Sequence, residues 1–276
     1  MTAAVTADAA GPGRGGRRHR PLPAWALGLA GLAGLMAAVE LAPRLGLVRD
    51  RYLPPFSAMV SALADQAGTP AFWRALLETL RGWAIGLAIA MVAGVVLGIV
   101  IGGVPLLRAA LNSTIEFLRP IPSVALIPLA VLLYGTEMRS TLLLVVYASF
   151  WQVLVQVLYG VQDVDPVARE TARSYRFRPL TQVRTVIWPT ALPYVMTGFR
   201  LSAAVALILE ITGELVIGTP GLGRQIAVAQ TSGAVASMYA LVIVVGLIGV
   251  VVNVIARFTE RRVLRWHPSV RREVAA

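Results

Sequence analysis

The sequence predicts an all-α, polytopic membrane helix bundle with about six transmembrane helices, and three features support this fold class: sparse charge, long apolar runs and biased arginine placement. Of the 276 residues, 57% are hydrophobic and only 14% are charged, whereas a soluble domain carries about 25% charged residues. The apolar runs reach about 20 residues, the length of helix that crosses a hydrocarbon core about 30 Å thick. This combination is typical of a chain that crosses the membrane several times.

The apolar runs divide the chain into a tail and six predicted spans. The spans are residues 24–42, 76–101, 106–133, 139–160, 194–217 and 236–257. The composition of residues 1–23 predicts a disordered, basic, cytoplasmic tail, which resembles the n-region of a signal peptide. The run that follows is long enough to span the bilayer and further spans come after it. We therefore expect residues 24–42 to be an uncleaved first transmembrane helix.

Arginine placement predicts the orientation. The formal net charge is +11, and every basic residue is Arg. Arginines cluster beside apolar spans, so the positive-inside rule explains the charge without a nucleic-acid partner. With both termini in the cytoplasm, the inner side holds Arg14, Arg17, Arg18, Arg20, Arg108, Arg169, Arg173, Arg176, Arg178, Arg184 and the arginines from Arg257 to Arg272. The outer side then holds Arg44, Arg49, Arg51, Arg74, Arg139 and Arg224, of which the first three run against the rule.

The absent residue types restrict the chemistry. The chain has no Cys, and its two histidines, His19 and His267, lie in terminal segments outside the spans. Neither a metal site built on Cys or His nor a Ser-His-Asp triad is expected inside the membrane. Without Lys, no Walker A motif can hold nucleotide phosphates. We expect no catalytic site, metal or cofactor, and any use of ATP requires another polypeptide.

Two spans carry distinctive patterns. The second span has small residues at strict four-residue spacing, which predicts a smooth face for close helix packing; these are Gly82, Gly86, Ala90, Gly94, Gly98 and Gly102. The third span is interrupted by Pro120, Pro122 and Ser123 and again by Pro128. Because proline removes a backbone donor, this helix must kink. The kink either lines a translocation pathway or is purely structural.

A polar stretch, residues 161–193, separates the fourth and fifth spans. Asp165 followed by Pro166 predicts a helix start, with an N-cap acceptor and proline at the first helical position. That helix should end near Pro179, and a second should follow over residues 180–187. Composition alone leaves two interpretations open: a knob that pushes on a partner, or a solvated loop on anionic lipid headgroups.

Several motifs in this order resemble bacterial ABC importer permeases. Glu170-Thr171-Ala172, continuing through residues 187–193, is similar to the family's EAA loop. Flanking motifs are similar to the sulfonate/taurine/nitrate-type branch, and these are Arg119-Pro120-Ile121-Pro122, Ala125-Leu126-Ile127-Pro128, Tyr134-Gly135, Asp163-Val164-Asp165-Pro166 and Gly221-Leu222-Gly223. The likeness covers residues 56–266, the expected permease domain. Thr171 replaces the family's first Ala, and Arg176 stands near its usual Gly.

The resemblance implies a function and partners. It implies a permease subunit of an ATP-driven importer in the bacterial inner membrane, embedded in lipid and paired as a homodimer. Separate ABC ATPase subunits and an extracytoplasmic solute-binding protein would complete the importer, and the cargo would be a small solute such as a sulfonate, taurine or nitrate. The cytoplasmic coupling helix that meets the ATPase would carry Glu170, Thr171, Ala172, Arg173, Tyr175 and Arg176.

Two acids lie inside the fifth span. Glu210 and Glu214 are four residues apart and therefore share one helix face. A carboxylate at the centre of a membrane helix costs about 2.5–3.5 kcal/mol, so such residues usually face a cavity or a partner. With Pro120, Pro122 and Ser123 they are our candidates for the translocation pathway. For Glu214 the alternative is an interfacial acid paired with an Arg.

Two other classes of protein compete with this interpretation. An ion-coupled secondary transporter would usually have inverted repeats, and no symmetry between the halves is visible. An intramembrane enzyme would need a nucleophile and a base, and Cys, membrane-embedded His and a G-x-S-x-G motif are all missing.

Overall fold

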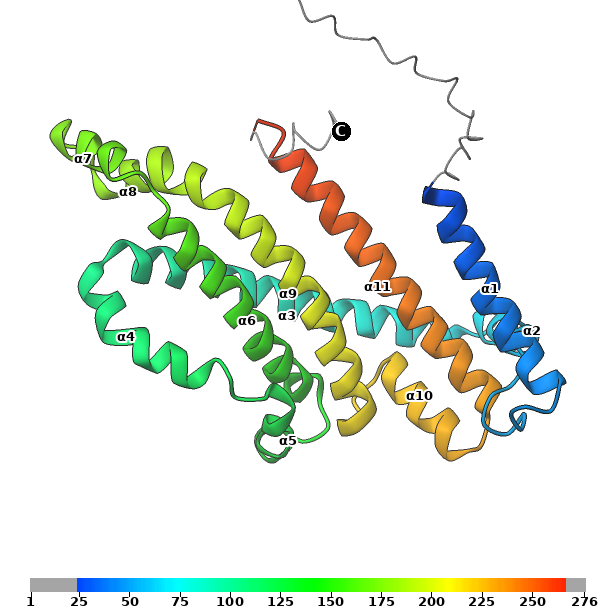
Figure 1. Cartoon of the computed structure of the whole chain (residues 1–276). Coiled ribbons are helices and arrows are strands. Elements are labelled where there is room, and N and C mark those ends of the chain that lie inside the picture. Colours follow the sequence, from blue (N-terminus) through cyan, green and yellow to red (C-terminus); the bar gives the residue numbers. More distant parts are fainter. Residues whose placement is uncertain (1–23, 267–276) are drawn as a thin grey trace, which may run out of the picture.

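The computed structural model describes residues 24–266, and within that range every regular element is helical, which confirms the all-α prediction (Figure 1). The predicted tail, His19 and His267 lie outside the described residues. The longer helices are α1 (Ala24–Arg44), α3 (Pro70–Gly103), α6 (Met138–Gln162), α9 (Trp188–Ile217) and α11 (Val235–Val263). The shorter helices are α2 (Phe56–Ala67), α4 (Pro105–Leu118), η1 (Ser123–Leu126), α5 (Ile127–Tyr134), α7 (Pro166–Ser174), α8 (Pro179–Gln182), η2 (Val183–Ile187) and α10 (Leu222–Thr231).

The core lies around α6, which packs against α3 on one side and α9 on the other. All six small residues of the predicted face on α3 are buried, so that prediction is confirmed. Four of the glycines each lie against one valine of α6, and the pairs are Gly86 with Val145, Gly94 with Val153, Gly98 with Val157 and Gly102 with Val161. We call these eight residues the glycine–valine seam. Because each glycine lacks a Cβ, α3 and α6 approach each other closely along the glycine–valine seam.

Length and composition give four helices in the described residues that could cross a membrane, namely α1, α3, α6 and α11. Two bent pairs bring the number to six if each pair is one span. One pair is α4 with the η1–α5 segment, and the other is the helix from Pro179 to Ile217 with α10. The predicted count of about six spans agrees with the upper number.

The predicted third span is not one kinked helix. α4 ends at Leu118, and the next helical segment, Ser123–Tyr134, turns away by 83°. The proline-containing residues between them are therefore a corner, sharper than a proline kink. The Tyr134-Gly135 motif of the resemblance forms a turn, since Gly135 has a φ of 65° and ends α5.

The helix predicted over residues 180–187 and the predicted fifth span, residues 194–217, are parts of one continuous helix. α8, the π-helical turn η2 and α9 follow one another without a break, so the helix runs from Pro179 to Ile217. Pro179 and Pro189 stand in the first turns of α8 and α9, where proline is tolerated. Pro193 lies inside α9, beside the π-helical turn, which changes the backbone register locally.

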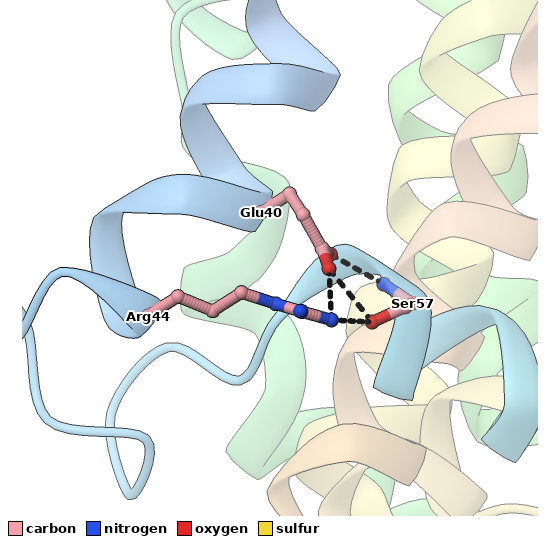
Figure 2. A network of polar contacts seen from close by, with 3 residues as sticks. All are labelled: Glu40, Arg44 and Ser57. Carbon is pink, nitrogen blue, oxygen red and sulfur yellow. Dashed lines mark hydrogen bonds and ion pairs between the residues drawn. The ribbon is translucent and has the colours of Figure 1, made fainter.

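α1 lies at the edge of the bundle and contacts α2. None of the apolar window that qualifies it as a span is buried within the chain. One polar network joins it to α2 (Figure 2): the Ser57 backbone N–H and side-chain O–H donate to the Glu40 carboxylate over 2.8 and 2.9 Å, and Arg44 pairs with Glu40 and donates to the Ser57 hydroxyl over 3.2 Å. We call these three residues the α1–α2 clip.

The helices give the molecule two unlike ends. In Figure 1 the start of α1, the end of α11 and the α7–α8 segment lie toward the top, whereas α2, α5 and α10 lie toward the bottom.

Candidate functional site

The α7 segment, residues 163–187, is built by specific end contacts. The carboxylate of Asp165 accepts a hydrogen bond from the backbone N–H of Val167 over 2.8 Å, and Pro166 occupies the first turn, as predicted. At the other end, the N–H groups of Arg176 and Phe177 donate to the carbonyls of Arg173 and Ala172 over 2.8 and 3.0 Å. These two bonds form a Schellman motif, which requires a left-handed residue.

Arg176 is that left-handed residue, with a φ of 53°. The related permeases are expected to have Gly near this position, because Gly enters the left-handed region without penalty. An L-residue pays about 1–2 kcal/mol there. The turn therefore has the same left-handed geometry that Gly favours. Having Arg176 in place of Gly raises the free energy of this backbone conformation.

The predicted coupling residues divide between two faces of α7. Ala172 is buried, with 3% of its surface exposed, and α7 packs against η2. The other five are exposed, and these are Glu170, Thr171, Arg173, Tyr175 and Arg176. Ala172 therefore faces the bundle, where a small side chain is needed, and the other five residues of the expected coupling helix face outward.

Two contacts anchor the segment to the membrane helices. The Arg169 guanidinium donates to the carbonyl of Val161, at the end of α6, over 2.9 Å. The Tyr194 hydroxyl, on α9, donates to the Asp163 carboxylate over 3.0 Å. Motion of α7 is thus tied to α6 and α9. The sequence analysis assigned no such role to Arg169 and Tyr194. Their partners lie on other helices or at helix ends, and contacts of that kind leave no regular spacing in the sequence.

The other candidate residues lie elsewhere. Pro120 and Pro122 are exposed and Ser123 is half-buried, all at the corner between α4 and α5. Glu210 and Glu214 are buried on α9, with 3% and 0% of their surfaces exposed. The five predicted pathway residues therefore form two groups, one at the corner and one on α9.

Glu214 is held by bonds from two other helices. Its carboxylate accepts from the Thr79 hydroxyl of α3 over 2.7 Å and from the Gly223 N–H of α10 over 2.8 Å. The Thr79 oxygen in turn accepts from the N–H of Leu222 over 2.9 Å. A Cβ at Gly221 would overlap the Glu214 carboxylate. Glu214 thus joins α3, α9 and α10, and its partners are a hydroxyl and a backbone amide in place of the arginine that we considered.

Glu210 has a different environment. One of its carboxylate oxygens, Oε2, is buried and has no hydrogen-bond partner among the described residues. The carboxylate lies over Gly82, where a Cβ would overlap it. Glu210 also lines a cavity of about 390 Å³ together with Glu78 and Glu137. Glu78 continues the four-residue spacing of the α3 glycine face by one step, a signal in the sequence that we did not use.

The comparisons with known proteins identify the family. Residues 90–265 match the model of the family described as "Binding-protein-dependent transport system inner membrane component". The chain belongs to this family, and it is the transmembrane permease subunit of an ABC importer. This excludes the secondary transporter and the intramembrane enzyme that we weighed.

Relatives and solved structures agree. The taurine transport system permease protein TauC of Escherichia coli (strain K12) is 30% identical over 249 residues, covering 88% of this chain and 90% of that protein. The putative aliphatic sulfonates transport permease protein SsuC of the same organism is 31% identical, covering 86% and 90%. In fold, the chain is similar to the MetNI methionine ABC transporter in an inward-facing conformation, with a TM-score of 0.59, 18% identity and coverage of 71% and 95%.

Proposed function

We propose that this permease imports a small sulfonate or a related oxyanion, and that α7 is the coupling helix through which a separate ATPase drives transport. The relatives of the chain support the cargo class, since they include taurine, aliphatic sulfonate and nitrate permeases. The lack of a Walker A lysine supports a separate ATPase. We expect the isolated chain neither to bind nor to hydrolyse ATP, which a nucleotide-binding assay on the purified permease measures.

The observation that carries the coupling role is the contrast between the two faces of α7. One face is fixed to the bundle through Ala172 and Arg169, and the other presents Glu170, Thr171 and Tyr175 to a partner. Tyr175 has 75% of its surface exposed although it is aromatic. Aromatic side chains are enriched at protein interfaces. A segment with a rigid inner face and an exposed outer face can transmit force from a partner to α6 and α9.

The test replaces an outward residue without disturbing the inner face. Glu170→Arg reverses a charge on the exposed face and should lower ATP-driven uptake at least about tenfold while membrane insertion stays normal. Asp65→Arg, at an exposed acid on α2 between the first two spans, is the matched control. A solvated loop predicts little effect, because surface changes usually stay within about 0.5 kcal/mol. Normal uptake and normal ATPase co-purification in Glu170→Arg would remove the coupling role. Ala172→Glu is unsuitable, since it would disrupt packing directly.

We propose that the α7 end of the bundle is cytoplasmic, together with both termini and the basic tail at residues 1–23. The arginines of the α7 segment support this orientation through the positive-inside rule. Because the chain has no Cys, single cysteines can be labelled from outside intact cells. Gln230→Cys on α10 should react with an impermeant reagent and Tyr175→Cys should not. The reverse pattern would invert the topology.

We also propose that the working unit contains two copies of this chain in lipid, with a solute-binding protein docking on the outer end. An open, apolar groove of about 920 Å³ between α5 and α6 supports a second copy, because it is lined by residues such as Leu129, Leu142 and Val146. The mass of the purified complex tests the copy number. Pro120, Pro122 and Ser123 at the corner, together with Glu210 and Glu214 on α9, remain our proposed pathway residues.

A further inference from the structure

Two adjacent cavities of opposite character lie at the α10 end of the molecule. The first is the cavity of about 390 Å³ that holds three carboxyl groups, those of Glu78, Glu137 and Glu210. The second, of about 430 Å³, has two guanidinium groups, those of Arg74 and Arg224. Glu78 and Pro220 line both cavities, so the two are neighbours.

The acidic cavity is more than a group of surface acids. Glu210 lines this cavity, and only 3% of its surface is exposed. Its Oε2 atom has no hydrogen-bond partner among the described residues. A buried polar atom without a partner costs about 1–3 kcal/mol, more if charged. The ion pairs of Arg44 with Glu40 and of Arg200 with Glu260 do not involve these three carboxyl groups.

The arrangement favours an organic cation over a metal ion. No three acidic or histidine side chains within residues 24–266 are placed to hold a metal. An alkylammonium group carries three N–H donors and no acceptor, which suits carboxyl oxygens spread around a wider cavity.

The neighbouring cavity supplies the opposite charge. Arg74 comes from α3 and Arg224 from α10, and Gln66 and Gln225 add amide groups beside them. Guanidinium groups are the side chains best suited to bind oxyanions through paired N–H donors. Two cavities that share the wall of Glu78 and Pro220 therefore present an oxyanion site next to an ammonium site.

We propose that these two adjoining cavities together form a binding site on the permease itself for a small zwitterion that carries an ammonium group and an oxyanion, such as an aminoalkanesulfonate. The oxyanion lies over Arg74 and Arg224, and the ammonium group enters the acidic cavity and pairs with Glu210. This inference rests on the proposed function in one respect only, the sulfonate class of the cargo. It adds that the permease distinguishes an amino sulfonate from a plain one without help from the binding protein.

The test measures equilibrium binding to the permease–ATPase complex in lipid nanodiscs, with no binding protein present. The probes are taurine, which has both groups, ethanesulfonate, which lacks the amine, and ethylamine, which lacks the sulfonate. Wild type should bind taurine at least about tenfold more tightly than either single-charge probe, the factor expected for one charged hydrogen-bonded contact.

Three variants assign the contacts. Glu210→Gln and the exposed Glu137→Gln should each weaken taurine binding about tenfold and leave ethanesulfonate unchanged. Arg224→Gln should weaken both sulfonates. Asp65→Asn and Arg49→Gln, exposed residues outside both cavities, are the controls for charge and should change nothing. Because Glu137 is exposed at the start of α6, its variant reports on the site even if Glu210→Gln folds poorly.

The inference is overturned if wild type binds taurine no better than ethanesulfonate, or if Glu137→Gln and Glu210→Gln weaken both sulfonates equally. ATP-driven uptake by the complete importer separates this result from failure of the proposed function. Uptake of ethanesulfonate without any preference for taurine would contradict the zwitterion site and leave the sulfonate cargo class standing. An importer that moves neither sulfonate would refute the proposed cargo class.

Discussion

The glycine–valine seam and the α1–α2 clip attach helices to the same bundle by opposite means. The seam uses no polar group: four glycines of α3 receive four valines of α6 over residues 86–102 of α3 and 145–161 of α6. The clip joins an otherwise unburied helix through one carboxylate, one hydroxyl and one guanidinium near the helix end (Figure 2). Close packing fixes the relative position of α3 and α6 along many contacts, whereas the clip fixes α1 at a single point.

The largest effect should come from filling the seam. A Cβ at Gly94 would lie 2.7 Å from the Val153 Cβ and 3.2 Å from the Leu154 backbone nitrogen. Because backbone atoms cannot move aside without shifting α6, Gly94→Val should lower the free energy of unfolding in detergent by about 3 kcal/mol. Gly31→Val is the matched control on α1, where a Cβ would meet nothing within 4 Å. Equal thermal stability of the two variants would show that the seam does not hold the bundle.

An intermediate effect is expected at the polar contact beyond the seam. Thr79→Val removes the donor to the Glu214 carboxylate and the acceptor of the Leu222 N–H. Two buried groups lose a partner, so stability should fall by about 2 kcal/mol. Thr231→Val serves as the control, since the Thr231 hydroxyl is exposed and bonds only carbonyls of its own helix. Thermal unfolding of both variants in detergent measures the difference, and a loss in Thr231→Val as large as in Thr79→Val would contradict the role of the network.

The smallest effect on the bundle should come from the clip. Ser57→Ala removes one hydroxyl from the Glu40 carboxylate and from Arg44. The unfolding midpoint of the bundle should not change measurably, because α1 contributes little buried surface. Proteolytic cleavage in the linker at residues 45–55 should accelerate about threefold, since local opening follows local stability. Ser61→Ala, which loses only a bond to its own helix, should cleave at the wild-type rate. Unchanged cleavage in Ser57→Ala would mean that the clip does not restrain α1.

Patterns with a local or periodic cause could be predicted from sequence. The glycine face of α3 follows from four-residue spacing, and the start of α7 follows from Asp165 and Pro166. The turn at Gly135 follows from the need for a left-handed residue. In each case one short stretch contains both the cause and the consequence.

Features set by distant partners could not be predicted in this way. The inward position of Ala172 depends on η2, and the different environments of Glu210 and Glu214 depend on Gly82 and Thr79 of another helix. Proline was misjudged as well. The same residue type forms an 83° corner before α5 yet lies within the long helix at Pro193 without breaking it.

The unbroken helix from Pro179 to Ile217 has a mechanical consequence. At 1.5 Å per residue it is about 55 Å long, and it runs from beside α7 to the wall of the acidic cavity. A stiff rod of this length converts a small tilt at one end into a proportionate displacement at the other. Under the coupling role that we propose for α7, a push on its exposed face travels along this helix toward Glu210 and Glu214. The extensive contact between α9 and α6 then carries the same movement into the core of the bundle.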